Sequence, residues 1–356
     1  MNQFKILSIN PGGTSTKVAL YLNENPLKEE TIRHSAEELS SFKGTLDQLE
    51  YRKELVLKFL EANRVQVREL AAVVGRGGTF KALESGTYGV SEKMIDDIRA
   101  GNVQADHPSN LGALIAHEIV SGTGVPAYIV DPVSVDEFIP EARISGLPEI
   151  KRVSLAHALN MKMVARKAAK QLGRRYEEIN LVIVHLGSGI SVGSSLKGKT
   201  IDVNNANDMG PFSPQRTGAL PVTGLAKLCF SGKYNKKEMM DLLTKKGGLL
   251  AHLGTDDVEE VQKRIDGGDV NANLIYNAMV YQIAKEIGAM ATTLDGKVDA
   301  IVLTGGIANS KRLTDSITRK VGFIAPVMVF PGEDELEALT RGALRVLSGE
   351  EKVKEY

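Results

Sequence analysis

The segment from Asn10 to Lys17 combines residue types that can hold a polyanion; it reads Asn-Pro-Gly-Gly-Thr-Ser-Thr-Lys. Its two glycines leave backbone N–H groups unshielded, and three hydroxyl groups and one ammonium group accompany them. A P-loop is disfavoured, because the spacing GxxxxGK[ST] is absent and a strand-like run rather than a helix follows Lys17. The segment therefore predicts phosphate binding, with an ordinary glycine hairpin as the alternative.

Two further glycine-rich segments occur later in the chain. The first reads His185-Leu-Gly-Ser-Gly-Ile-Ser-Val-Gly193, and a dinucleotide-binding fold is disfavoured for it because the glycine spacing is wrong and a strand-like run follows. The second reads Ile301-Val-Leu-Thr-Gly-Gly-Ile-Ala-Asn-Ser310; it follows an apolar run and precedes a predicted helix, where a nucleotide could lie against bare backbone. Three such turns in one order predict a phosphate or nucleotide site more specifically than any one alone.

The elements around these turns form a repeated pattern. Strand-like runs at residues 4–9 and 18–22 form a predicted hairpin, and runs at 181–185 and 192–195 repeat it. The offset is about 175 residues, far longer than the period of a solenoid, so we interpret the chain as two copies of one unit. Helix-like segments at 46–63, 91–101, 109–121 and 153–172 alternate with strand-like runs at 71–75 and 125–130. The fold class is therefore α/β.

The second half is predicted to contain helices at 236–246, 256–265, 272–294 and 335–347, with strands at 300–303 and 327–330. An apolar stripe in the segment 272–294 is formed by Ile275, Met279, Ile283, Ile287 and Met290. Its spacing predicts a core face or a subunit seam rather than a cofactor site.

Composition limits the classes of function. A chain of 356 residues exceeds what one core usually serves, so two domains are expected. The 44 basic and 44 acidic side chains cancel, so no overall field favours nucleic acid or an anionic membrane. Cys229 is the single cysteine, and neither a signal peptide nor a membrane-spanning run is apparent. We expect a soluble, cytoplasmic protein that binds neither nucleic acid nor membrane.

These motifs together carry a resemblance: the sequence is similar to the acetokinase family, within the acetate and sugar kinase, Hsp70 and actin superfamily. The segments that resemble family signatures are Asn10 to Lys17, Gly75-Arg-Gly-Gly78, Asp106-His-Pro-Ser-Asn110, Val130-Asp131, Ala156-His157, Val184-His-Leu-Gly-Ser-Gly189, Pro214-Gln-Arg-Thr-Gly218 and Thr304-Gly-Gly-Ile307.

The resemblance implies two duplicated actin-like (ribonuclease H-like) domains with an active-site cleft between them. The first would comprise residues 1–152 completed by the C-terminal helix 336–356. The second would comprise residues 153–335 and carry nucleotide-binding and dimerisation elements. It also implies ATP and Mg²⁺ as cofactors and a homodimer or a higher homo-oligomer.

The family resemblance assigns roles residue by residue. An ionised carboxylate needs no general base to attack phosphorus, so positioning and charge neutralisation must provide the catalysis. Family positions imply that the catalytic residues are Arg76, Asp131, His157 and Arg216, and that the acid-binding residues are Arg76, Gly78, His107 and Ala156. They imply that nucleotide or phosphate is bound by Gly12, Gly13, Ser15, Lys17, His185, Gly187, Gly189, Asp256, Gly305, Gly306 and Ile307. Mg²⁺ would be organised by Asn10, Asp334 and Glu335, with the choice between the two carboxylates open. His34, His117 and His252 match no motif, and we interpret them as structural.

Small residues near two of these positions indicate which acid is used. Acetate kinases carry Gly-Phe-His-Gly around the catalytic histidine and Val-Val after the first arginine, whereas this chain has Ala156 and Gly77-Gly78. The freed volume predicts a larger acyl pocket, and each buried methylene contributes about 0.8 kcal/mol. The resemblance is closest to the butyrate kinase branch, which implies reversible phosphorylation of butyrate, or of a short branched acid, by ATP. The direction of flux stays open.

Alternative functions remain at this point. The nearest is an acetate or propionate kinase with the same mechanism. A sugar kinase or polyphosphate phosphatase of the superfamily would instead use another acceptor. A non-catalytic actin-like or chaperone-like nucleotide-binding module would not need the set Arg76, His157 and Arg216.

Overall fold

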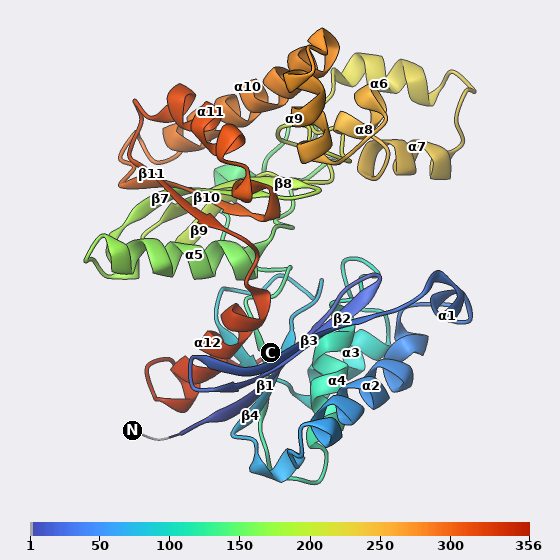
Figure 1. The fold of residues 1–356 in the computed structure, drawn as a ribbon, viewed down its shortest axis with the longest axis vertical. Coiled ribbons are helices and arrows are strands. Elements are labelled where there is room, and N and C mark those ends of the chain that lie inside the picture. Colours follow the sequence, from blue (N-terminus) through green and yellow to red (C-terminus); the bar gives the residue numbers. More distant parts are fainter. Residues whose placement is uncertain (1–2) are drawn as a thin grey trace. The chain divides into compact units, whose positions relative to one another are not determined.

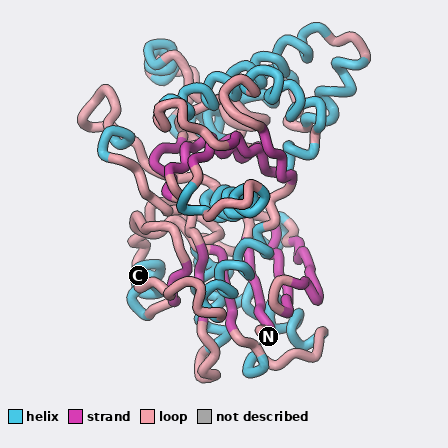
Figure 2. Tube along the Cα trace, turned by 90° about the vertical axis from the view of Figure 1, so that its left-hand side faces the viewer, coloured by secondary structure: helices cyan, strands magenta, loops and turns pink. Residues whose placement is uncertain are grey.

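The computed structural model describes residues 3–356, which divide into two compact units. Unit 1 comprises residues 3–136 and 334–356, and unit 2 comprises residues 137–333. Each unit has one sheet with helices on both faces (Figures 1 and 2). The predicted α/β class is confirmed.

Unit 1 contains a six-stranded sheet in the order β3-β2-β1-β4-β6-β5. The strands are β1 (Lys5–Pro11), β2 (Ser15–Leu22), β3 (Asn25–Arg33), β4 (Ala72–Arg76), β5 (Thr87–Gly89) and β6 (Ala127–Val130). Strands β1, β4 and β6 run parallel, whereas β2 and β3 form an antiparallel meander with β1.

The helices of unit 1 are α1 (Ala36–Ser40), α2 (Leu49–Ala62), α3 (Glu92–Arg99), α4 (Asn110–Val120) and α12 (Glu335–Leu347). Helix α4 packs against β4 and β6, and α12 packs against β1 from the other face (Figure 1). The hydroxyl groups of Ser8 and Thr340, 2.7 Å apart, join α12 to β1. The C-terminal helix is therefore packed within the first unit.

Unit 2 contains a five-stranded sheet in the order β11-β10-β7-β8-β9. Its strands are β7 (Asn180–Leu186), β8 (Ile190–Leu196), β9 (Lys199–Val203), β10 (Ala300–Gly305) and β11 (Val327–Pro331). Helix α5 (Ala158–Gln171) covers one face and α10 (Val270–Thr292) the other (Figure 1). The remaining helices are α6 (Val222–Cys229), α7 (Lys236–Thr244), α8 (Gly248–Leu253), α9 (Val258–Asp266) and α11 (Lys311–Val321). Short 3₁₀ turns occur at Leu46–Gln48, Val67–Glu69, Pro140–Arg143, Tyr176–Glu178 and Gly306–Asn309.

The two sheets share one topology. In each, a first strand forms an antiparallel meander with the next two strands and lies parallel to a fourth and then a fifth. The register shifts within the second pairing of both meanders, at Leu20/Tyr21 and at Ser194/Ser195. The duplication inferred from the repeated hairpins is therefore present in the backbone.

The boundaries between the units differ from the predicted ones. The first unit ends at Asp136 rather than at residue 152, because the segment after it is bonded to unit 2. Lys162 Nζ lies 2.5 Å from Glu137 Oε2, and Arg152 forms a two-pronged pair with Asp202. The second boundary falls at 333/334, two residues before the predicted start of the last helix segment.

The predicted helix at 272–294 begins slightly earlier, at Val270, because Asp269 caps it by accepting from Ala272 N. Met279, Ile283 and Ile287 of its apolar stripe are fully buried in the core of unit 2. The stripe is therefore a core face, and the alternative of a subunit seam along it is wrong. Strands β3, β5 and β9 and helices α1, α6 and α8 were not predicted. Strand β3 is exposed along nearly its whole length, so it lacks the alternation that reveals a half-buried strand.

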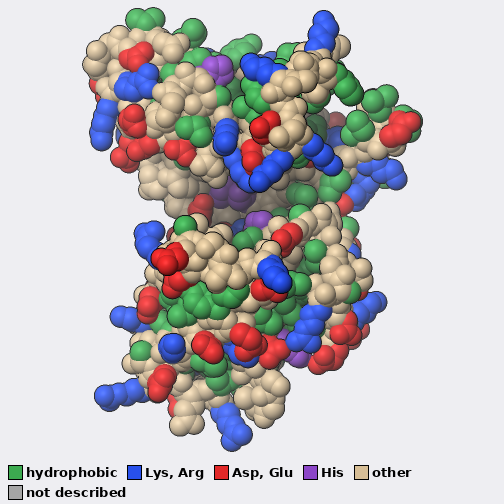
Figure 3. Space-filling model, turned by 90° about the vertical axis from the view of Figure 1, so that its right-hand side faces the viewer, with side chains coloured by type: hydrophobic (Ala, Val, Ile, Leu, Met, Phe, Trp, Pro, Cys, Tyr) green, Lys and Arg blue, Asp and Glu red, His purple; other side chains and the backbone are tan. Residues whose placement is uncertain are grey.

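No helix within residues 3–356 is both long and apolar enough to cross a membrane. The surface charge is mixed: Lys and Arg (blue) and Asp and Glu (red) both occur over the visible face of each unit (Figure 3).

Candidate active site

Several of the predicted site residues lie at the carboxyl ends of the parallel strands in each unit. In unit 1, Asn10 lies near the end of β1, Arg76 ends β4, and Asp131 follows β6. In unit 2, His185 lies near the end of β7, and Gly305 ends β10. The carboxyl edge of an open parallel sheet is where ligands of α/β proteins bind, because the strands stop there and loops begin.

A cluster of three side chains forms the centre of the site in unit 1. Arg76 Nη1 lies 2.6 Å from Glu335 Oε1 and donates to Asn10 Oδ1 at 3.2 Å, while Asn10 Nδ2 donates to Glu335 Oε2. All three are at least half-buried. The Nε atom of Arg76 is buried and forms no hydrogen bond within residues 3–356, so the guanidinium group retains capacity for a further acceptor.

The two candidate metal carboxylates differ in placement. Glu335 is the first residue of α12 and meets Asn10, and the helix N-terminus favours its negative charge. Asp334 precedes the helix with a left-handed backbone (φ +40°) and forms no side-chain cap. Within residues 3–356, no three His, Cys, Asp or Glu side chains cluster so that they could hold a metal ion by themselves.

Asp131 and His107 have clear local partners in unit 1. Asp131 is buried, with a left-handed backbone at φ +38°, and its Oδ1 accepts from Ser85 Oγ (2.6 Å) and Gly86 N (2.8 Å). One carboxylate oxygen therefore orders the turn at residues 85 and 86. His107 is exposed, and its Nδ1 accepts from Ser109 N at 3.2 Å. The ring orientation is thus set by the loop before α4.

The glycines after Arg76 serve close packing. A Cβ atom on Gly77 would lie 2.8 Å from Pro132 Cα, and one on Gly78 would lie 2.8 Å from Asn110 Cα. The volume that these glycines free is therefore filled by residues of unit 1, which removes them from the argument for a larger acyl pocket. The tight approach instead allows Thr79 N to donate to Asn110 Oδ1 at 2.8 Å.

The glycine hairpin between β1 and β2 contains Gly12, Gly13 and Ser15, with Lys17 within β2. Gly12 N donates to Ser15 O at 2.7 Å and closes the turn. Beneath the turn lies Arg52 of α2, which is fully buried and which the sequence interpretation did not include. The signal was present: Arg52 shares the buried stripe of α2 with Val56 and Phe59, and a charge on an apolar helix face is unusual.

Two stacked imidazoles form the centre of the site in unit 2. The rings of His157 and His185 are 3.8 Å apart and nearly parallel, at 10°. His157 Nδ1 lies 3.0 Å from Ser191 Oγ. His185 Nδ1 lies 2.8 Å from Asn160 Oδ1, and because a carbonyl oxygen only accepts, Nδ1 of His185 carries a proton.

Asn160 joins several parts of this unit and was missed by the sequence interpretation. Its Nδ2 donates to Glu333 O at 2.9 Å, and the side chain is almost fully buried. It lies three residues after His157, which places both on one side of the first turn of α5. That spacing was the available signal.

Arg216 lies against the glycine turn of the second hairpin. A Cβ atom on Gly189 would be 2.4 Å from Arg216 Nη1, so only glycine permits this approach. Burial lowers the pKa of Arg216 below its usual value, although the group remains cationic. The neighbouring Gln215 donates from Nε2 to Asp256 Oδ2 at 2.5 Å. Arg216 thus lies against Gly189, whereas Asp256 is bonded to the neighbouring Gln215; Gly187 shapes the same turn by donating to Gly189 O.

The third glycine motif, Thr304 to Ile307, lies at the end of β10. Gly305 has φ +92°, and a Cβ atom there would lie 2.3 Å from Leu186 O, so β10 can approach β7 only with glycine. Gly306 and Ile307 begin a short 3₁₀ turn; Gly306 is exposed and Ile307 packs against the core. The exposed backbone at Gly306 fits the predicted contact with a nucleotide.

Ala156 lies in the segment immediately before α5 and is half-buried.

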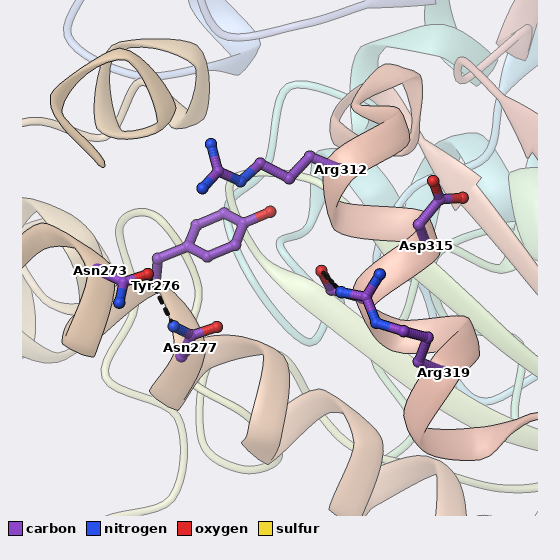
Figure 4. A pocket seen from close by; sticks show the side chains of 7 residues that line it. Asn273, Tyr276, Asn277, Arg312, Asp315 and Arg319 are labelled. Carbon is purple, nitrogen blue, oxygen red and sulfur yellow. Dashed lines mark hydrogen bonds between the residues drawn. The ribbon is translucent and has the colours of Figure 1, made fainter. Parts of the chain in front are cut away.

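A separate pocket of about 300 Å³ lies between α10 and α11 and is lined by Tyr276, Arg312 and Arg319, among others (Figure 4). None of the predicted site residues lines it.

The comparisons with known proteins agree with these motifs. The model of the acetokinase family matches residues 149–335. Butyrate kinase 2 of Clostridium acetobutylicum is 52% identical over 355 residues, covering 99% of both chains. The chain belongs to the acetokinase family.

Solved structures of this fold include the acetate kinase of Porphyromonas gingivalis, at 19% identity and a TM-score of 0.76 over 96% of this chain and 99% of that one. A propionate kinase of Francisella tularensis shares 20% identity with a TM-score of 0.74, over 95% and 98% of the chains. At these identities the likeness concerns the fold, which is the duplicated actin-like fold expected from the motifs. Membership of this kinase family also implies the use of ATP.

Proposed function

We propose that this chain is a butyrate kinase, which transfers the γ-phosphate of ATP reversibly to butyrate or a short branched carboxylate. The products are the acyl phosphate and ADP. The observation that carries the proposal is the 52% identity to a butyrate kinase over 99% of the chain. The predicted residues support it, because several of them fall at the carboxyl edges of two sheets, where they form an ion-paired cluster in unit 1 and a pair of stacked imidazoles in unit 2.

The chemistry asks for positioning rather than for a strong base. The acid is ionised at neutral pH, so one of its oxygens attacks the γ-phosphorus directly while the bond to the β-phosphate oxygen breaks. No proton needs to be removed from the nucleophile. The protein must therefore align the two oxygens and neutralise the charge on the transferring group.

Arg76 is proposed to bind the acid and the transferring phosphoryl group. Its Nη1 is held by Glu335 and Asn10, which fixes the direction of the fork, and its Nε has no protein acceptor within residues 3–356. A planar guanidinium group with a fixed orientation suits paired oxygens. Asp131 and His107 hold the neighbouring loops by the hydrogen bonds described above.

In unit 2, Arg216 and the stacked histidines are proposed to stabilise the phosphoryl oxygens. The lowered pKa of Arg216 reflects a poorly hydrated guanidinium group, and charge stabilisation is stronger where water is excluded. Asn160 Oδ1 accepts a hydrogen bond from Nδ1–H of His185 and so fixes the orientation of that ring. The glycines at 187, 189, 305 and 306 would let phosphate oxygens approach backbone N–H groups.

Mg²⁺ fits the donor set of unit 1. Asn10 Oδ1 and the Glu335 carboxylate both lie against Arg76 Nη1, and Mg²⁺ is usually held by one or two carboxylates with substrate phosphates and water. When bound, it would neutralise charge on the phosphate chain. We propose Glu335 rather than Asp334 as its carboxylate, because only Glu335 is bonded to Asn10.

The preference for a longer acid rests on Ala156. The glycines at 77 and 78 are packed against Pro132 and Asn110 and supply no extra space. Ala156 stands directly before His157, where acetate kinases carry an aromatic side chain, and it is not fully buried. The change from phenylalanine to alanine at this place is the remaining source of volume for an acyl chain.

The test is hydroxamate trapping of acyl phosphate with Mg-ATP and a series from acetate to valerate that includes isobutyrate. We expect the highest kcat/KM with butyrate or isobutyrate. An optimum at acetate or propionate would favour the acetate or propionate kinase alternative. No hydroxamate with any acid would contradict the proposal.

Ala156→Phe is the matched variant, and it should penalise butyrate more than acetate. Equal losses on both acids would show that residue 156 does not line the acyl site. We also propose a cytoplasmic homodimer or higher homo-oligomer, which size-exclusion chromatography with light scattering checks. A monomer at the working concentration of the enzyme would contradict this part.

A further inference from the structure

We propose that Arg52 is a positioning residue that withdraws the carbonyl oxygens of the Gly12–Ser15 turn from a bound phosphate chain. The proposal rests on the proposed function, because it assumes that this hairpin binds the phosphates of ATP. Arg52 lies on α2, between the family motifs that end at Lys17 and begin at Gly75, and its role follows from its contacts alone.

The guanidinium group of Arg52 is fully buried and is saturated by neutral oxygens. Its Nη1 donates to Gly12 O (2.9 Å) and Ser15 O (3.2 Å), and its Nη2 donates to Gly13 O at 3.4 Å. Its Nε and Nη2 both donate to Gln48 Oε1, at 3.0 and 2.8 Å. One side chain therefore holds three carbonyl groups of a single turn.

The remaining carbonyl group of the turn is also engaged, since Thr14 O accepts from His34 N at 2.9 Å. By contrast, the N–H groups of Gly13 and Thr14 donate to no atom of residues 3–356, and both residues are exposed. The turn thus presents donors outward and keeps acceptors inward. This is the polarity that an anion requires, because an outward carbonyl dipole would repel it.

The charge of Arg52 has no partner of opposite sign. Arg52 forms no ion pair within residues 3–356, and burial lowers its pKa below the usual value. A buried cation without a carboxylate is costly and is rarely kept without a reason. A polyphosphate on the far side of the turn would supply the missing negative charge.

A chain of hydrogen bonds from Arg52 through Thr16 and His34 to Tyr51 holds the Arg52 side chain in place. Arg52 Nη1 donates to Thr16 Oγ1 (3.0 Å), and Thr16 Oγ1 lies 2.9 Å from His34 Nε2. His34 Nδ1 in turn lies 3.1 Å from the hydroxyl group of Tyr51. The Tyr51 hydroxyl group is hydrogen-bonded to the Glu38 carboxylate, which only accepts, so Tyr51 donates there and accepts from Nδ1–H of a neutral His34. Nε2 of His34 then accepts from the Thr16 hydroxyl group. His34 is structural, as predicted, and its structural role is to support this turn.

The experiment uses the full-length enzyme with Arg52→Met and Arg52→Lys, and titration calorimetry with ATP, ADP and adenosine. Arg345→Met is the control: Arg345 is a little-exposed cation of the same unit whose Nε donates to Glu351 Oε2 at 2.7 Å, away from the turn. We expect Arg52→Met to weaken ATP and ADP binding about tenfold to a hundredfold, the worth of charge-assisted hydrogen bonds. Adenosine binding and the KM of the acid should stay unchanged, and Arg52→Lys should recover part of the loss.

Either of two results would overturn the proposal. One is wild-type affinity for ATP in folded Arg52→Met. The other is an equal loss for ATP and adenosine that Arg345→Met reproduces, because a general loss of stability would act that way. If Arg52→Met does not fold, Gln48→Leu replaces it: selective weakening of ATP binding supports the proposal, and unchanged binding overturns it. Failure of the proposed function is separate, since it would appear as wild-type enzyme that binds ATP but forms no acyl phosphate.

Discussion

The two units share one strand order but carry different chemistry at the same place. The fourth strand of the topology ends in Arg76 in unit 1, whereas in unit 2 it ends in Gly305, followed by Gly306. Arg76 offers a guanidinium fork, and Gly306 offers bare backbone. The duplicated scaffold therefore places different residue types at corresponding strand ends, which can support different binding chemistry.

The hairpins differ in the same way. In unit 1, Arg52 lies beneath the turn and bonds its carbonyl oxygens, while in unit 2 Arg216 lies against the Cα of Gly189. One arginine is fully buried and supports the backbone; the other is only half-buried and can face a ligand. Similar turns can thus recruit an arginine for support or for direct binding.

The largest expected effect comes from the two proposed ligand-binding arginines. Arg76→Ala and Arg216→Ala should each lower kcat by about 100-fold to 1,000-fold, as expected when a donor to the developing charge is lost. The hydroxamate assay with saturating butyrate and ATP measures this. The Lys variants serve as controls that keep the charge but lose the fork. If either Ala variant retained more than about a tenth of the wild-type rate, that unit would not supply a phosphoryl-stabilising group.

Alanine substitutions at two glycines that look alike in the sequence should have very different effects on the free energy of unfolding. Gly75→Ala should destabilise unit 1 by about 3 kcal/mol or more, because its Cβ would lie 2.1 Å from Gly112 O of α4. Gly13→Ala should cost less than about 0.5 kcal/mol, because nothing lies within 4 Å of its Cβ. Urea unfolding compares the two. Similar losses would show that the contact between α4 and β4 does not govern the need for glycine.

Substitution of Asn160 tests whether the fixed orientation of His185 matters in unit 2. Asn160→Leu should lower stability by about 1–3 kcal/mol, because the buried N–H group of His185 would lose its acceptor. It should also lower kcat, since the ring orientation is no longer fixed. Asn273→Leu, an exposed asparagine of α10, is the control and should change neither quantity. Equal kcat values for Asn160→Leu and wild type would show that the orientation of His185 is unimportant.

The smallest effect concerns pH and belongs to unit 1. Burial first, and then the charge of Arg52, lower the pKa of His34 below its ordinary value of 6.5, whereas Glu38 acts in the opposite direction. The unfolded state therefore binds the proton more tightly than the folded state. The contribution of neutral His34 to the free energy of unfolding is therefore complete above about pH 6.5 and is lost as the pH falls through the lower folded-state pKa. His34→Gln should weaken this acid-side decline in the free energy of unfolding, measured from pH 7 to pH 5. An identical slope in wild type and variant would contradict the assignment.

Local patterns in the sequence predicted most of the architecture and the strand ends at which several candidate site residues lie. The two hairpins, the parallel strands at 71–75 and 300–303 and the helix at 335–347 could be predicted because their apolar periodicity follows from a half-buried or fully buried position. Strand β3 could not, because it is exposed and its pairing with β2 comes from the meander rather than from its own pattern. The roles of Gly77 and Gly78 were interpreted wrongly as free volume, because their close neighbours Pro132 and Asn110 are distant in sequence.

The sequence by itself determined the fold class, the duplication and the family, since glycine turns and strand patterns are local features that survive in order along the chain. Only the tertiary structure decided that Glu335 rather than Asp334 meets Asn10 and Arg76, because these residues lie on elements more than 200 residues apart. It also decided that Arg52 contacts the glycine hairpin of unit 1 and that Asn160 contacts His185 of unit 2. Their importance depends on burial and on partners brought together by packing, which no local pattern records.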